Sequence, residues 1–445
     1  MQRPTRALAV IAVGLGAILG AADGVRAAAP WSDPQAVPGG FPGGVEQLRF
    51  DGAGHGRLIG LGRTRQNGRV DRVLAAPVEG GRPGPAAVST TRLDMTRLRL
   101  HGRDGVVAGG DAALARGRLG HPLGRRQPIR GRARSSQLLD LAVNEAGDAV
   151  AAVRWCRTRG CGRQALALFR WRAGKRISRP LSLDRGRGLG AGVAINGRGD
   201  IAIVRDRVTG GGRREVVGQI LTAGGTLRRA RRLGAARAAP RYRIALADDR
   251  RVVAAWLAQA VSECDARPGE IAVAQAARGG RFTPARRLAA LDITGCGRYV
   301  SEAGVAFARG PDGRVLIAWS GNEGGRWVVR AGELGPSGVA NAAVVSDRAS
   351  DAVLSDLAVG PGGDAVILLA DGVGGSDSTG PNRLLAVTRS AAAGVFGAPE
   401  TVTDGMALDS VAAFDPATGR ATVGMITTDA QFMPFASVVT REPSE

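Results

Sequence analysis

One short phrase recurs along this chain of 445 residues: an apolar run, a turn that carries Gly or Asp, and a second apolar run. Two clear copies span residues 141–155 and 193–204, and four later copies span 244–256, 305–319, 357–369 and 411–426. Strand pairs joined by tight turns, repeated at intervals of about 40 to 60 residues, are typical of a radial β-repeat such as a propeller.

The number of turns predicts the number of blades. Two less regular copies upstream, at 47–61 and 98–108, bring the number of turns to eight. The 415 residues from Trp31 to Glu445 then provide about 52 residues for each blade. We therefore predict an all-β fold over residues 30–445, a single propeller of eight four-stranded blades. Seven blades are the alternative if one upstream copy is only a loop.

The clearest repeat predicts how one blade is built. Its four strands are expected at 138–144, 149–155, 165–172 and 177–183. The two middle strands are almost continuously apolar, as strands covered on both faces should be. Gly147 and Asp148 lie in the turn between the first two strands, and both residue types favour tight turns. We therefore interpret the recurrent Asp as a turn residue rather than a ligand.

The last repeat is incomplete at its carboxyl end. Its third strand is expected at 432–439, after which the chain ends. Residues 31–37 resemble the fourth-strand phrases at 282–288 and 396–402. The sequence therefore predicts that the segment after the leader supplies the missing strand and closes the ring, which pairs the free sheet edges.

Residues 1–27 have the layout of a secretory signal peptide. Arg3 and Arg6 precede an apolar stretch from Ala7 to Ala22, and small residues follow at 27–29. The apolar stretch is shorter than a membrane span and contains three glycines, and no later stretch is long enough to span. No Cys lies near the expected cleavage site. We expect a secreted, extracellular protein without a lipid anchor or a transmembrane segment in its mature chain.

Four cysteines lie in the expected mature chain: Cys156, Cys161, Cys264 and Cys296. An even number in an oxidising compartment favours two disulfides, and four cysteines allow three pairings. In the repeat pattern, Cys156 and Cys161 bracket one loop, whereas Cys264 and Cys296 lie in two loops that leave the same face of the ring. We therefore predict the pairs Cys156–Cys161 and Cys264–Cys296. The three histidines are far from the cysteines in sequence, so no metal site is expected.

The net charge of +22 is unevenly distributed. Residues 1–298 hold 52 basic and 22 acidic side chains, whereas residues 299–445 hold 9 and 17. A ring built from this sequence has one basic arc and one acidic arc. The basic arc could attract an acidic wall polymer, a polysaccharide or a nucleic acid. A solvated surface without a ligand is the alternative, because Lys175 is the only lysine and such a bias toward arginine is typical of GC-rich genomes. Nucleic acid is not expected, since aromatic residues make up only 4% of the chain.

The segment 307–320 resembles the strand-turn-strand repeat of Tol-type bacterial propellers, in which a Pro-Asp-Gly turn precedes an apolar strand. The whole chain resembles uncharacterised secreted propeller-like proteins of high-GC bacteria. These resemblances depend on structural residues. They imply a fold and transfer no catalytic residue.

Sialidases offer an enzymatic alternative. That family uses an arginine cluster with a tyrosine nucleophile, and its Ser-x-Asp-x-Gly-x-x-Trp turn is absent here in that form. The only two tyrosines, Tyr242 and Tyr299, follow Arg241 and Arg298, and each begins an expected inner strand at the loop face. These four residues are the candidate catalytic residues of a sialidase-like glycoside hydrolase or lyase. The structural alternative is that each tyrosine caps a strand end.

No other catalytic pattern is present. The chain lacks a Gly-x-Ser-x-Gly nucleophile motif and the Lys-Ser/Thr ending of a phosphate loop, and the acidic spacing in 371–377 matches no calcium loop. We therefore expect no cofactor. The sequence favours a monomeric, non-catalytic propeller that binds a polymer or protein partner through its loop face.

Overall fold

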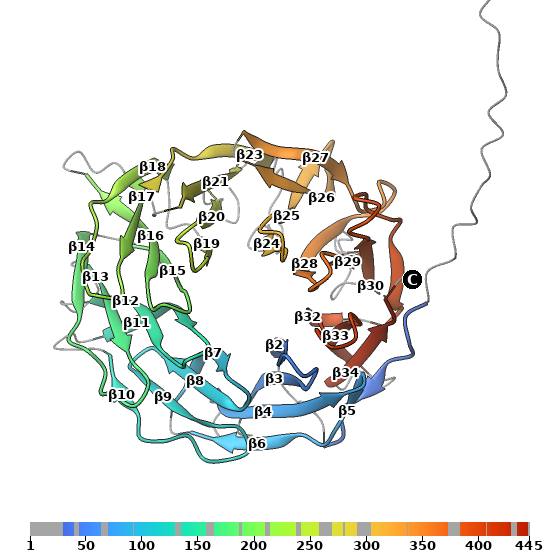
Figure 1. Cartoon of the computed structure of the whole chain (residues 1–445), viewed down its shortest axis with the longest axis horizontal. Helices are drawn as coiled ribbons and strands as arrows, with labels where there is room; N and C mark the ends of the chain where they lie inside the picture. Colours follow the sequence, from blue (N-terminus) through green and yellow to red (C-terminus); the bar gives the residue numbers. More distant parts are fainter. Residues whose placement is uncertain are drawn as a thin grey trace, which may run out of the picture.

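The computed structural model describes the following residues: 30–39, 44–63, 70–91, 93–129, 135–156, 164–186, 189–209, 214–236, 242–257, 269–278, 281–291, 304–335, 337–372, 383–405, 407–428 and 434–443. These residues form eight antiparallel sheets arranged as blades around a central opening (Figure 1). The predicted eight-bladed β-propeller is confirmed, and both irregular upstream copies are complete blades. No helix in the described ranges has the length and apolar character needed to cross a membrane.

The first four blades contain strands β2 to β18. In each of them the first strand in chain order is the inner one, and the later strands lie progressively outward. The first blade contains β2 (Val45–Phe50), β3 (Gly56–Arg63), β4 (Val70–Glu79), β5 (Arg82–Pro83) and β6 (Ala87–Thr90). The second contains β7 (Met95–His101), β8 (Gly105–Gly110), β9 (Ala113–Arg118) and β10 (Gln127–Pro128). The third contains β11 (Ser135–Val143), β12 (Ala149–Cys156), β13 (Gln164–Trp171) and β14 (Leu181–Gly186). The fourth contains β15 (Ala191–Ile195), β16 (Ile201–Val208), β17 (Arg214–Leu221) and β18 (Arg231–Ala236).

The other four blades continue the ring in chain order. The fifth contains β19 (Tyr242–Leu246), β20 (Val252–Leu257), β21 (Gly269–Ala277), β22 (Arg281–Phe282) and β23 (Arg286–Leu291). The sixth contains β24 (Val305–Arg309), β25 (Val315–Glu323), β26 (Arg326–Gly335) and β27 (Gly338–Val344). The seventh contains β28 (Ala352–Val359), β29 (Ala365–Asp371), β30 (Arg383–Arg389) and β31 (Glu400–Thr403). The eighth contains β32 (Ala407–Phe414), β33 (Ala421–Thr428), β34 (Pro434–Arg441) and β1 (Gln35–Ala36).

Strand β1 closes the ring from the other end of the chain. Gln35 and Ala36 pair with Val438 and Ser437 of β34. The backbone N–H of Val37 donates to the carbonyl of Ala436 at 2.9 Å. The predicted closure by residues 31–37 is therefore confirmed, although only two of those residues form regular strand.

The apolar core lies between neighbouring blades. One cluster joins Val204 of the fourth blade to Ala254 and Trp256 of the fifth, and all three side chains are inaccessible to solvent. Small side chains such as Ala151 and Ala254 let the middle strands of adjacent blades approach closely. Since each blade buries its faces only against its neighbours, the eight blades stabilise one another.

Turn residues between the first and second strands hold the third, fourth and seventh blades to their own outer hairpins. Gly147 has a φ of 82°, a left-handed conformation that favours glycine. The carboxylate of Asp148 accepts a hydrogen bond from the N–H of Ala173 at 2.8 Å. Asp200 accepts one from Ala223 at 2.9 Å in the next blade. These bonds agree with the interpretation of the recurrent Asp as a structural residue.

The fourth strand of the third blade begins later than the sequence predicts. We expected a strand at 177–183, whereas β14 begins at Leu181. The preceding residues form the hairpin, in which Ser178 N–H bonds to the carbonyl of Arg170 and the indole N–H of Trp171 bonds to that of Lys175. Pro180, which lacks an N–H, falls immediately before the strand.

We expect Val37→Ala to lower the free energy of unfolding by about 2 kcal/mol. The side chain is 4% exposed and packs with Val45 of the first blade and Val438 of the eighth. Thermal unfolding measures the loss. Gln35→Ala is the control, because that side chain is exposed in the same closing segment. Equal melting temperatures for the two variants would contradict a closing role for this segment.

Candidate functional site

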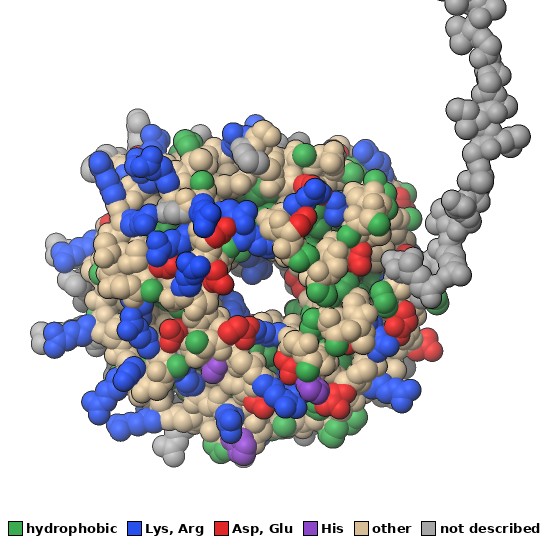
Figure 2. All heavy atoms as spheres, viewed as in Figure 1, with side chains coloured by type: hydrophobic (Ala, Val, Ile, Leu, Met, Phe, Trp, Pro, Cys, Tyr) green, Lys and Arg blue, Asp and Glu red, His purple; other side chains and the backbone are tan. Residues whose placement is uncertain are grey.

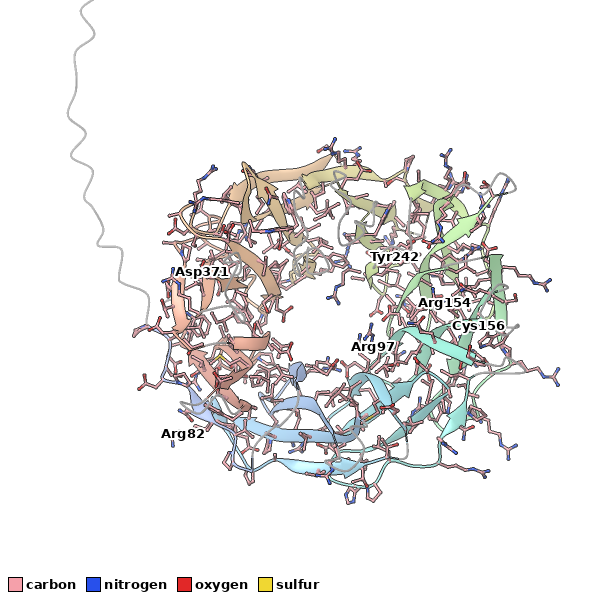
Figure 3. All side chains as sticks on the ribbon, turned by 180° about the vertical axis from the view of Figure 1, so that it is seen from behind. Arg82, Arg97, Arg154, Cys156, Tyr242 and Asp371 are labelled. Carbon is pink, nitrogen blue, oxygen red and sulfur yellow. The ribbon has the colours of Figure 1, made fainter. Side chains whose placement is uncertain are left out.

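The inner strands of the blades surround an opening that passes through the ring, with acidic and basic side chains around it (Figure 2). Arg97 of β7 points into this opening (Figure 3). Charged groups on inner strands of non-adjacent blades lie within electrostatic reach of one another: burial raises the pKa of Asp356 of β28 and lowers that of Arg99 of β7, and the charge of Arg243 of β19 acts to lower both. These groups therefore face a common channel.

Carboxylates of the channel wall have raised pKa values. Burial raises the pKa of Asp356 to about 6, although hydrogen bonds from two backbone N–H groups and the positive charge of Arg243 act to lower it. Burial also raises the pKa of Glu46 and Asp140, although Arg99 and Arg97 act in the opposite direction on both. Desolvation thus outweighs the neighbouring arginines at each position.

Several of these inner-strand groups clamp one blade to the next. Asp140 accepts a hydrogen bond from the N–H of Val193 at 2.9 Å, and Asp356 accepts one from Ala412 at the same distance. The side-chain oxygen of Gln47 likewise accepts a hydrogen bond from the N–H of Leu100 at 3.2 Å. All three follow a bulge in their inner strand. The sequence analysis missed this role, although Asp-Leu-Ala-Val recurs at 140–143 and 356–359 and is the signal that could have found it.

Tyr242 begins β19 and donates its hydroxyl to a carboxylate oxygen of Asp206 on β16. Asp206 is inaccessible to solvent and also accepts a hydrogen bond from the N–H of Gly190 at 3.1 Å. Burial raises the pKa of Asp206 to about 6. Burial, together with the nearby Asp206, raises the pKa of Tyr242. The ring of Tyr242 lies 6.3 Å from that of Trp256.

A hydroxyl bonded to a carboxylate is an arrangement that a nucleophile and its base can share. Here the pair lies between the fourth and fifth blades, and the raised pKa keeps the phenol protonated. The neighbouring Arg205 is 4% exposed and bonded to Asp184 and Gln219. These contacts support a structural role for Tyr242.

The other candidate catalytic residues, Tyr299, Arg241 and Arg298, lie outside the described residues, so their convergence with Tyr242 remains a prediction. The same is true of both disulfides: Cys156 ends β12, whereas Cys161, Cys264 and Cys296 are outside the described ranges. Within those ranges, no group of three or more His, Cys, Asp or Glu side chains is placed to hold a metal ion.

A cavity of about 280 Å³ opens on the face that carries the turns between first and second strands. We call it the turn-face cavity; the first three blades supply its charged lining, which consists of Arg49, Asp51, His55, Arg57, Arg103 and Glu145. His55 Nδ1 lies 3.1 Å from a carboxylate oxygen of Asp51. Hydrogen bonds from the backbone and ring of His55 lower the pKa of Asp51, although desolvation acts against them.

Basic side chains gather along the outer edge that carries β10 to β18 (Figure 2). We define the basic edge as the exposed Lys and Arg residues of the outer hairpins and strands in the second to fifth blades: Arg118, Arg125, Arg126, Arg172, Lys175, Arg176, Arg179, Arg185, Arg228, Arg229, Arg231, Arg232, Arg278, Arg281, Arg286 and Arg287. Ion pairs in this set include Arg232 with Glu215 at 3.3 Å and Arg287 with Glu270 at 3.7 Å.

No family model and no curated protein matches this chain. Among solved structures, it is similar to a puromycin hydrolase at 18% identity and a TM-score of 0.42, covering 75% of this chain. The similarity spans 50% of that hydrolase.

Two other solved structures are similar over most of their length. A protein of unknown function from Dyadobacter fermentans is 12% identical, with a TM-score of 0.41 and coverage of 94% of this chain and 100% of the other. The polysaccharide lyase Uly1 is 7% identical, with a TM-score of 0.41 and coverage of 90% of each chain. At these identities and TM-scores, no function transfers to this chain.

The raised pKa of Asp206 predicts a pH effect on stability. The folded state binds this proton more tightly than the unfolded state, so the contribution is present below about pH 3.9, the pKa of an unfolded Asp, and is lost as pH rises through about 6. Between pH 5 and pH 7, the deprotonation of Asp206 alone should lower the free energy of unfolding by about 1 kcal/mol. Thermal unfolding should therefore show a shallower pH dependence for Asp206→Asn than for the wild type. Parallel curves would contradict the assignment.

Tyr242→Phe should destabilise the protein by about 2 kcal/mol at pH 7, because it removes a hydrogen bond to a buried charge. The loss should shrink at pH 5, where Asp206 is mostly protonated. Chemical unfolding at both pH values measures the difference. In an Asp206→Asn background the same substitution should show no such pH dependence, and a loss that is independent of pH in both backgrounds would rule out the coupling.

Proposed function

We propose that this chain is an exported, non-catalytic propeller that binds an anionic polysaccharide along the basic edge. The observation that carries this proposal is the separation of opposite charges in the second to fifth blades. Their basic side chains project from the outer hairpins and strands, whereas carboxylates such as Asp200 and Asp206 are inaccessible to solvent. The exposed field of this edge is therefore positive and attracts polyanions.

The internal carboxylates already have partners. Asp200 bonds to Arg250 at 2.8 Å, and Asp148 bonds to the N–H of Ala173. Glu215 and Glu270 pair with Arg232 and Arg287 of the basic edge, but Asp200 and Asp148 do not neutralise its other arginines. A composition bias alone explains the abundance of arginine in the sequence, but it does not explain why Asp200 and Asp206 are inaccessible to solvent while the arginines of the outer hairpins are exposed.

An extended polymer fits this surface better than a compact partner does, because the basic residues continue over four consecutive blades. Nucleic acid is disfavoured because Trp171 and Phe282, which lie beside Arg172 and Arg281 of the basic edge, are each only 6% exposed and offer no face on which bases could stack. The sequence favoured the loop face for binding, and several loops of that face lie outside the described residues. The basic edge instead uses the outer hairpins and fourth strands.

We expect Arg179→Gln/Arg229→Gln to weaken retention on an acidic polysaccharide such as polygalacturonate by about three- to tenfold, because each exposed ion pair contributes at most about 1 kcal/mol. Affinity chromatography with a salt gradient measures the effect, and the variant should elute at lower salt. Arg314→Gln/Arg348→Gln removes two exposed arginines from the acidic arc and serves as the matched control.

The experiment also separates the alternative partners. Retention on an acidic protein column but not on polygalacturonate would replace the polysaccharide by a protein partner. Elution of both double variants with the wild type, or no retention of the wild type at low salt, would overturn the proposal.

A further inference from the structure

We propose that the turn-face cavity binds a single oxyanion group, a carboxylate, sulfate or phosphate, through Arg49, Arg103 and the backbone N–H of Gly102. This inference does not depend on the basic edge. It begins from a position at which the first blade departs from the repeat.

In three of the eight blades the residue before the second strand has the same structural role. In the third, fourth and seventh blades it is Asp148, Asp200 or Asp364, whose carboxylate bonds to an N–H of the outer hairpin of the same blade. In the first blade this position is His55, whose ring bonds to Asp51 at the start of the same turn. An imidazole held at Nδ1 directs its second nitrogen away from Asp51, and His55 Nε2 has no partner among the described residues.

A carboxylate of the protein already occupies part of this site. Glu145 extends from the turn of the third blade and accepts a hydrogen bond from the N–H of Gly102 at 3.2 Å, and it forms an ion pair with Arg49. A backbone N–H and a guanidinium that converge on one carboxylate are the donors an oxyanion site needs. The side chain of Glu145 is 64% exposed, so burial does not hold it in place. An external anion can displace it.

The remaining charges favour an anion. Arg57 is engaged by Asp104 at 3.4 Å and by the carbonyl of Gly56. Arg103 is exposed and has no ion pair within the described part of the chain. The lining therefore contains three arginines and one histidine against the carboxylates of Asp51 and Glu145. With Glu145 displaced, the site has one acidic group, and that group is bonded to His55.

Isothermal titration of the full chain with inorganic phosphate, sodium sulfate and glucuronate tests the proposal. Glu145→Gln should bind at least one of these anions about five- to tenfold more tightly than the wild type, because the internal competitor loses its charge. The double variant Glu145→Gln/Arg103→Gln should bind the same anion about three- to tenfold more weakly than Glu145→Gln does. Glu442→Gln, at another exposed ion pair in the eighth blade, is the matched control and should bind as the wild type does.

The probes distinguish the sources of the anion. Binding of phosphate or sulfate indicates a free inorganic ion, whereas binding of glucuronate alone indicates the carboxylate of a sugar. Glu145→Gln that keeps the wild-type melting temperature but binds none of the three anions, or binds them no more tightly than the wild type, would overturn the proposal. Arg179→Gln/Arg229→Gln should leave these titrations unchanged, so a failure of polysaccharide binding at the basic edge is separable from a failure here.

Discussion

The structure depends on apolar contact between neighbouring blades. The middle strands of a blade have no face toward water, and each is covered only by the next blade on either side. An open ring would leave the outer faces of its first and last blades exposed to water, along with the hydrogen-bonding groups of one sheet edge. The pairing of β1 with β34 is therefore required by the same physics that packs the other blades, and Val37 contributes to both the edge pairing and the core.

Polar groups reinforce this packing where the blades approach the axis. Asp140 and Asp356 accept N–H groups from the inner strand of the following blade, and the Tyr242–Asp206 pair bridges the fourth and fifth blades. Burial of these carboxylates is unfavourable, which their raised pKa values record. Hydrogen bonds offset that cost only while the blades keep their relative positions. The buried charges consequently favour one spacing of the ring over others, and they are committed to structure rather than to a ligand.

Much of the fold could be predicted from the sequence because its causes are local. A glycine such as Gly147 and an apolar run on each side define the inner hairpin of a blade, and the phrase at 31–37 indicated the closing strand. Outer strands were harder to place, as β14 shows, because an exposed edge strand has little apolar pattern and its start depends on the hairpin before it. The clamps of Asp140 and Asp356 were missed although their motif repeats, because the partner N–H belongs to a different blade. Sequence spacing alone does not show that contact.

Candidate sites are harder to predict than the fold, and for a physical reason. The tyrosines were selected because each follows an arginine and begins an expected inner strand at the loop face, and the sequence does not show that the hydroxyl of Tyr242 is bonded to a buried carboxylate. The sequence assigned no role to His55, because it does not show that the residue at the same position in three other blades bonds to the outer hairpin. In the third, fourth and seventh blades the Asp at this position serves the scaffold, whereas His55 of the first blade bonds within its own turn beside a cavity. A departure from the structural pattern beside a cavity is a better guide to a ligand than the pattern itself.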